Sequence, residues 1–68
     1  MKVYTVGLHD GIDRIFSSCE EAIKWANENR GTRIENGYRN QLQTAFYIEE
    51  FELDGGRTET PGISIYRR

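Results

Sequence analysis

The fold is decided by residues 3–31, which read VYTVGLHDGIDRIFSSCEEAIKWANENRG. Over 3–8 one face is apolar at every second position, which is the period of a strand with one buried side. Asp10-Gly11 then stands between two apolar runs, and this pair indicates a tight hairpin turn. The pattern predicts a strand, a turn and a second strand over 12–16.

The rest of this stretch predicts a helix of about three turns that begins after Ser18 and ends at Gly31. Ser18 and Glu21 have the spacing of a capping box, in which the serine oxygen accepts a backbone N–H that the first turn leaves unpaired. Trp25 lies on the flank of the apolar stripe, where it either completes the core or protrudes. The stripe itself consists of Cys19, Ala22, Ile23, Ala26 and the stem of Arg30.

Residues 31–44 form a polar segment that we treat as a variable excursion of the chain. Apolar residues recur in it at a spacing of four, which suits a helix, whereas Asn36-Gly37 would suit a small hairpin. Both conformations stay open at this point. In either one, we expect Tyr38 and Leu42 to pack against the sheet.

Residues 46–53 carry the strongest strand pattern of the chain, with one irregularity. Ile48 and Phe51 are three residues apart, which breaks strict alternation. A bulge at Glu49-Glu50 would turn both apolar side chains inward, as would a sheet that is covered in part on its second face.

A turn at 54–56 and a final strand over 58–66 complete the chain. Pro61-Gly62 interrupts that strand, and proline is confined to a sheet edge or a break because it cannot donate to the ladder. The sequence therefore predicts an α+β fold in β-β-α-β-β order, a small antiparallel sheet of three to four strands with one helix packed on it. The 68 residues make a single domain over 1–68, too short for a Rossmann or barrel enzyme.

Five short motifs run through residues 3–30 and 46–54. They are Val3-Tyr4-x-Val6, Asp10-Gly11, Ile15-Phe16-Ser17-Ser18, Glu20-Glu21-Ala22-Ile23 and Tyr47-Ile48-Glu49-Glu50-Phe51-Glu52-Leu53-Asp54. Together they resemble a family of small uncharacterised proteins from bacteria and their phages, in which a "YSS" or "FSS" cap precedes an "EEA" helix and a strand reads like "IEEYELD". The chain departs from that family at 31–45 and after Asp54. The resemblance implies this fold and a phage or prophage setting, and it carries over no site residues.

The charge balance excludes some partners. Nine basic and eleven acidic side chains give a net charge of −2, whereas affinity for a phosphate backbone needs clustered Lys and Arg. Cys19 is the one cysteine, and the longest apolar run, 45–48, is far below the roughly 20 residues that span a bilayer. No signal-peptide pattern follows Met1-Lys2. We expect a cytoplasmic protein, in the host cytoplasm if a phage encodes it, with no membrane partner.

Two groupings could carry chemistry, and neither has the spacing that the chemistry needs. Cys19 could be a nucleophile with His9 as its base, but five strand residues at about 3.3 Å each place them roughly 16 Å apart. We therefore interpret Cys19 as a small buried hydrophobic residue. His9, Asp10 and Asp13 lack a recognised metal-ligand spacing, and no nucleotide or zinc motif occurs. We expect no catalytic residue, no cofactor and no metal site.

The candidate partner-binding residues are aromatic, basic and acidic. Trp, Tyr and Arg dominate interface hot spots. The carboxylates cluster at 49–54, where they would either keep a strand soluble or form an acidic face that docks a basic patch. The candidates are Trp25, Tyr38, Arg39, Glu49, Glu50 and Glu52.

The sequence favours a non-enzymatic protein-binding module and, with the resemblance, a phage-encoded factor that binds and modulates a host protein. The acidic strand and the 31–44 segment would be its contact surfaces. A nucleic-acid-binding domain is left open, in which Tyr47, Tyr66 and Arg67-Arg68 contact bases and phosphates. So is a subunit of an oligomeric ligand-binding protein or enzyme. A homodimer through the final edge strand is compatible with each.

Overall fold

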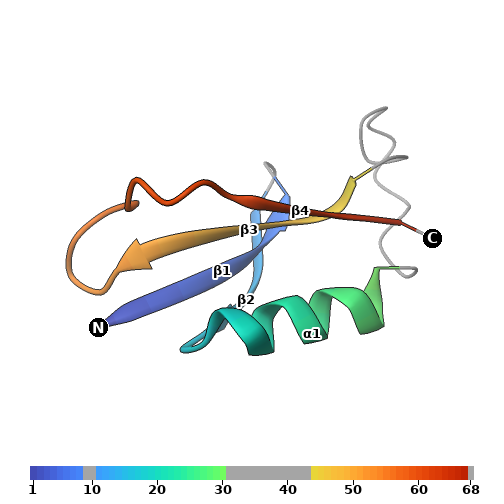
Figure 1. Ribbon diagram of the computed structural model, residues 1–68, viewed down its shortest axis with the longest axis horizontal. Coiled ribbons are helices and arrows are strands. Elements are labelled where there is room, and N and C mark those ends of the chain that lie inside the picture. Colours follow the sequence, from blue (N-terminus) through green and yellow to red (C-terminus); the bar gives the residue numbers. More distant parts are fainter. Residues whose placement is uncertain (9–10, 31–43, 68) are drawn as a thin grey trace.

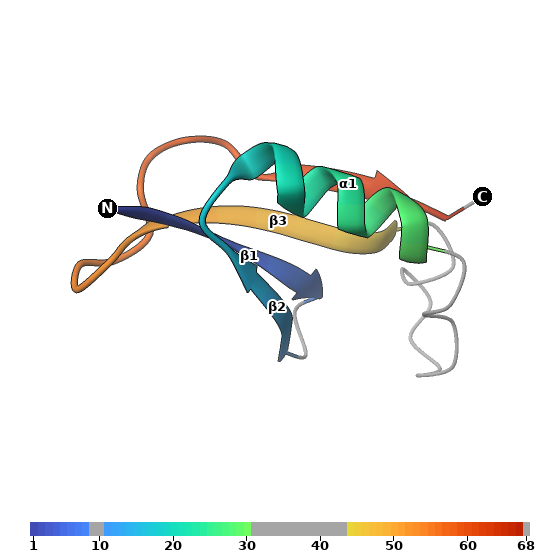
Figure 2. The same ribbon diagram turned by 90° about the horizontal axis from the view of Figure 1, so that it is seen from below.

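The computed structural model describes residues 1–8, 11–30 and 44–67 of the chain. Its elements are β1 (Lys2–Leu8), β2 (Gly11–Phe16), α1 (Cys19–Asn29), β3 (Thr44–Glu52) and β4 (Ile63–Tyr66). The strands form one antiparallel sheet in the order β2-β1-β3-β4. α1 lies along one face of this sheet and contacts all four strands, as Figure 1 and the turned view of Figure 2 show. The α+β fold predicted from the sequence is therefore confirmed.

β1 and β2 form the predicted hairpin, and its ladder contains a bulge. Val6 pairs with Arg14 and Gly7 pairs with Ile12, so Asp13 is an extra residue on β2. An extra residue of this kind changes the face to which the following side chains point. The tip of the hairpin lies outside the described residues.

The bulge brings the two strands unusually close at Gly7. A Cβ atom there would overlap the carbonyl oxygen of Gly11 and would lie 2.9 Å from Cα of Ile12. Both are backbone atoms, which cannot swing aside as the end of a side chain can. Glycine is therefore required at this position by the close approach of β2.

α1 begins where the capping pattern predicts. The backbone N–H of Glu21 donates to Oγ of Ser18 at 3.3 Å, and Ser18 has the extended backbone of an N-cap residue. Arg30 is the C-cap. The stop predicted at Gly31 lies outside the described residues.

The core lies between α1 and the sheet. The ring of Trp25 packs on Phe46 at a centroid distance of 5.1 Å and on Phe16 at 6.3 Å, so this tryptophan completes the core. The guanidinium of Arg14 lies 5.4 Å from the centroid of the same ring, in cation–π geometry. Among the described residues, the buried core consists of Val6, Ala22, Ala26, Ala45, Phe46, Ile48 and Ile65.

β3 has no bulge at Glu49-Glu50, which was one of two predicted alternatives, and its register shift lies elsewhere, between Thr44 and Phe46 in the pairing with β4. Its register against β1 runs without a shift through Glu49-Glu50, so the bulge expected there is wrong. Ile48 therefore faces the helix, while Phe51 faces the opposite side, where the guanidinium of Arg57 lies 5.8 Å from its ring centroid. This is the other alternative, a sheet whose second face is covered in part.

The turn predicted at 54–56 is confirmed. The backbone N–H of Gly55 donates to the carbonyl of Glu52 at 2.8 Å, and the N–H of Glu52 donates to the carbonyl of Gly56 at 2.9 Å. Asp54 has a φ of 65°, in the left-handed region that aspartate tolerates better than most residues.

The last strand is shorter than the sequence predicts. β4 begins at Ile63, directly after Pro61-Gly62, and it lies at an edge of the sheet, as the proline requires. Residues 58–60, which were expected to belong to the strand, form a loop instead. Thr58 and Thr60 in this loop donate hydrogen bonds to Glu50. These bonds satisfy polar groups of the loop without a strand ladder and hold the loop in place.

We expect Gly7→Ala to destabilise the fold by about 1–3 kcal/mol, because the added methyl group forces the backbone of β2 away from β1. This change in the free energy of unfolding is measured by urea titration, with tryptophan fluorescence as the signal. Gly56→Ala is the matched control, because a Cβ atom there would meet nothing within 4 Å. The control should change the free energy of unfolding by less than about 0.5 kcal/mol. Equal effects of the two substitutions would contradict the close approach at Gly7.

Candidate interaction surface

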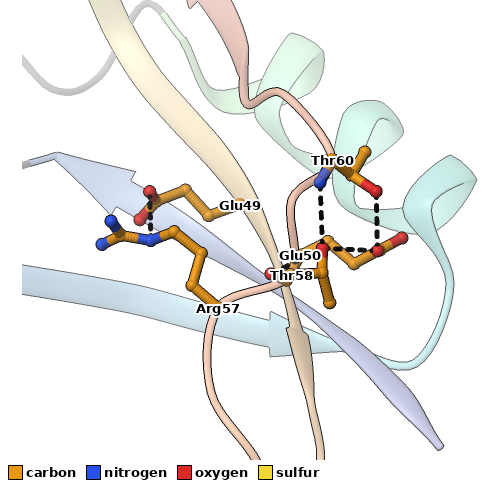
Figure 3. Close-up of polar contacts among 5 residues, drawn as sticks. All are labelled: Glu49, Glu50, Arg57, Thr58 and Thr60. Atoms are coloured by element: carbon orange, nitrogen blue, oxygen red, sulfur yellow. Dashed lines mark hydrogen bonds and ion pairs between the residues drawn. The ribbon is translucent and has the colours of Figure 1, made fainter.

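Glu50, one of the predicted partner-binding residues, accepts three side-chain hydrogen bonds from within the chain. Its Oε1 accepts from the hydroxyl groups of Thr58 at 2.7 Å and Thr60 at 2.9 Å (Figure 3). Its Oε2 accepts from the hydroxyl group of Tyr4 at 2.9 Å. The backbone N–H of Thr58 also donates to the Glu50 carbonyl at 3.0 Å. Glu50 therefore ties the loop after β3 to both central strands.

These hydrogen bonds shift the pKa of both titratable partners. The hydroxyl groups of Thr58, Tyr4 and Thr60 hold the pKa of Glu50 below its usual value, because each of them stabilises the carboxylate. The bond to Glu50 in turn raises the pKa of Tyr4, since loss of its proton would bring two anions together. At neutral pH the pair therefore keeps one proton, on Tyr4.

The neighbouring carboxylates have partners of their own. Glu49 points to the other side of β3, where Nε of Arg57 lies 3.0 Å from its Oε2 (Figure 3). Glu52 accepts a hydrogen bond from the N-terminal ammonium group of Met1 at 2.8 Å, which lowers the pKa of Glu52. Because consecutive strand residues point to opposite faces, the acidic residues of β3 do not form a single acidic surface.

The other residues selected from the sequence lie in different places. Trp25 packs into the core, where its ring contacts other aromatic rings. Cys19 is a free thiol and is only half-buried, so it is more exposed than predicted, because it is the first residue of the helix and lines a shallow pocket beside Tyr4 and Pro61. Tyr38, Arg39 and His9 lie outside the described residues.

The bulge at Asp13 places two isoleucines on the face of the sheet opposite α1. Ile15 pairs with Thr5 and Ile12 pairs with Gly7. Thr5 and Gly7 are alternate residues of β1, so the side chains of both isoleucines point to the same side. Each isoleucine is 60% exposed.

The other flank of this face carries two tyrosines. Tyr47 pairs with Gly7 on one side and with Ser64 on the other. Tyr66 comes two residues after Ser64 on β4, so it points to the same side as Tyr47. Their exposed fractions are 38% for Tyr47 and 58% for Tyr66. The Tyr47 ring leans over Gly62, where a Cβ atom would overlap it.

Between these flanks the face is hollow. Its middle consists of small residues, Thr5, Gly7 and Ser64, while the larger Tyr47 and Phe51 stand at its border. The hollow has a volume of about 610 Å³ and is open to solvent on one side. We call this face, from the isoleucines of β2 to the tyrosines of β3 and β4, the open face. No element among the described residues covers it.

The sequence alone does not single out the open face. Ile12 and Ile15 are three residues apart in a strand, which is a signal for a bulge, and here the bulge exists. Ile48 and Phe51 have the same spacing, and there the strand is regular. Only the register of each strand against β1 distinguishes the two cases.

Comparison with protein-family models, with curated proteins and with solved structures finds no match to this chain. Over 1–8, 11–30 and 44–67, no group of three or more His, Cys, Asp or Glu residues could hold a metal ion. In the same part of the chain, no helix is long and apolar enough to cross a membrane. The open face is therefore selected on its geometry and chemistry.

We expect Glu50→Gln to lower the thermal midpoint of unfolding at neutral pH, because the neutral amide is a weaker acceptor for the three hydroxyl groups. The pKa of Glu50 lies below its usual value of 4.5 in the folded state. Its stabilising contribution is therefore present above that value and is lost as the pH falls through the folded-state pKa. In calorimetry from neutral to acidic pH, the wild-type midpoint should approach that of the variant.

Glu49→Gln is the matched control for this measurement. It lies on the same strand and points to the other face, and its partner Arg57 has a side chain that is 64% exposed. Ion pairs with so exposed a partner contribute little, so the control should lower the midpoint less. If both variants lost the same stability at every pH, the role given to Glu50 would be wrong.

Proposed function

We propose that this protein is a non-enzymatic protein-binding module and that its partner docks on the open face. The observation that carries the proposal is the gathering of exposed apolar side chains on one face, over which no helix or strand of the described residues lies. They are Ile12, Ile15, Tyr47 and Tyr66. A small soluble domain gains nothing for its own stability from apolar groups that stay in water, whereas contiguous exposed apolar patches mark interaction sites.

The sequence composition favours the carboxylates of β3 as the contact surface, whereas their contacts in the structure favour the open face. Glu49, Glu50 and Glu52 all have intramolecular partners, so a basic patch of a partner would compete with contacts that already exist. On the open face the Glu49–Arg57 ion pair carries no net charge. A partner surface that is mainly apolar fits this neutral face better than a strongly basic one.

The setting of the proposal comes from the resemblance to small bacterial and phage proteins over 3–30 and 46–54. We therefore propose a host protein as the partner, and modulation of that protein as the role.

A photocrosslinking experiment in host cells tests the proposal. The crosslinking amino acid p-benzoylphenylalanine replaces Ile15 on the open face in one variant and Lys24, an exposed position of α1, in the other. Irradiation should give a discrete adduct with another protein from position 15, and the same adduct should be absent from position 24.

Three results would count against the proposal. One is the absence of an adduct from position 15, and another is the same adduct from both positions. The third is an adduct from position 15 with twice the 7.9 kDa mass of the chain, because it would identify the occupant of the open face as a second copy.

A second candidate function rests on the two tyrosines. Tyr47 and Tyr66 lie on neighbouring strands of one sheet face, an arrangement on which the bases of a single strand can stack. Arg57 is engaged by Glu49, which weakens the basic component that such binding needs.

The salt dependence of binding separates this candidate from the first. If the open face binds single-stranded nucleic acid, fluorescence anisotropy with a labelled oligonucleotide should show binding at low salt that weakens steeply as salt increases. Tyr47→Ala should reduce this binding by about fivefold or more, as loss of one stacked base predicts. An oligonucleotide that does not bind even at low salt removes this candidate.

A further inference from the structure

We infer that the hollow of the open face receives an aromatic side chain with a polar edge, tyrosine or tryptophan, from the partner. This inference rests on the proposed function and specifies the chemistry of the contact. It follows from the shape of the hollow, from the hydrogen-bonding groups that line it and from its charge.

The shape of the hollow suits a flat ring. The short side chains of Thr5 and Ser64 lie in its floor, so a flat ring can approach the sheet there more closely than over larger side chains. Tyr47 and Phe51 offer aromatic surfaces at the border, and Ile12 offers an aliphatic one. A volume of about 610 Å³ that is open on one side exceeds the needs of one ring, and it leaves room for the backbone that carries the ring.

The lining of the hollow requires more than an apolar occupant. The residues Thr5, Thr44 and Ser64 contribute hydroxyl groups, and Glu49 contributes a carboxylate. A carboxylate accepts up to about four hydrogen bonds, and Arg57 lies against only one of its oxygens, Oε2. An aliphatic side chain would cover these groups and would replace none of their hydrogen bonds to water, which is costly. The O–H of tyrosine or the N–H of tryptophan supplies a donor.

The charge of the hollow argues against a charged occupant. Glu49 and Arg57 neutralise each other at 3.0 Å, and the guanidinium of Arg57 also covers Phe51. A lysine from the partner would compete with Arg57 for the carboxylate, while a phosphate would meet the carboxylate as a like charge. An uncharged side chain with an apolar body and one donor therefore fits the hollow best, and Tyr and Trp are also the residues most enriched in interface hot spots.

Side-chain analogues test the inference on the full chain. p-Cresol, 3-methylindole and toluene stand for the side chains of tyrosine, tryptophan and phenylalanine. Each is titrated into the ¹⁵N-labelled protein while backbone amide shifts are recorded. We expect p-cresol and 3-methylindole to shift the amides of Thr5, Gly7 and Ser64, with dissociation constants on the order of millimolar, as is usual for fragments of this size. Toluene should bind about twofold to tenfold more weakly, the range that one net hydrogen bond accounts for.

Two variants locate the site and the hydrogen bond. Thr5→Val keeps the shape of the side chain and removes its hydroxyl group, so it should reduce the preference for p-cresol over toluene. Ser64→Leu fills the floor of the hollow, so it should abolish the shifts caused by all three probes. Lys24→Leu adds the same side chain to an exposed position on α1 and should change neither result.

The possible results are decisive for the inference. Equal affinity for toluene and p-cresol would show an apolar site without a polar contact, and this result would overturn the inference. Binding that survives Ser64→Leu would overturn the inference as well. Absence of shifts in the hollow for all probes would also overturn it, while an adduct from Ile15 could still support the proposed function. Probe binding without any such adduct would instead leave the proposed function without support.

Discussion

The structure depends on the antiparallel pairing of β1 with β3. Their register runs without a shift from the pair of Lys2 with Glu52 to the pair of Gly7 with Tyr47. The residues that this ladder pairs are 40 to 50 positions apart in the chain, and the ladder decides which side chains meet the helix. A slip of one residue would turn the side chains of β3 to the other face relative to those of β1. It would move Ile48 out of the core and would separate Glu50 from the Tyr4 hydroxyl group, from which it accepts a hydrogen bond.

The helix covers one face, and the short chain has no second described element for the other. A sheet of this size needs cover on one side to be stable, and α1 supplies it through Trp25 and the alanines of its buried stripe. The bulge in β2 then places Ile12 beside Ile15 on the side that the helix leaves uncovered. The hollow is a consequence of small residues in the middle of that side, because Thr5 and Ser64 cannot fill the space between larger neighbours.

The features that the sequence predicts well are local ones. The cap at Ser18, the turn at 54–56 and the break before β4 each depend on a few adjacent residues whose chemistry permits one conformation. The features that it does not predict are relations between strands. Nothing near Glu50 in the chain shows that Tyr4 and Thr60 donate to it, and only the register against β1 shows that Asp13 is bulged while Glu49-Glu50 is not.

The carboxylates at 49–54 illustrate why a cluster in the sequence need not be a cluster on the surface. Charges that are adjacent in a strand are separated by the sheet itself, so Glu49 and Glu50 belong to different surfaces with different partners. Glu50 is used to fasten a loop, and Glu49 is neutralised by Arg57. The exposed apolar side chains that share one side of the sheet, Ile12, Ile15, Tyr47 and Tyr66, are brought together by strand pairing in the same way that the charges are separated by it.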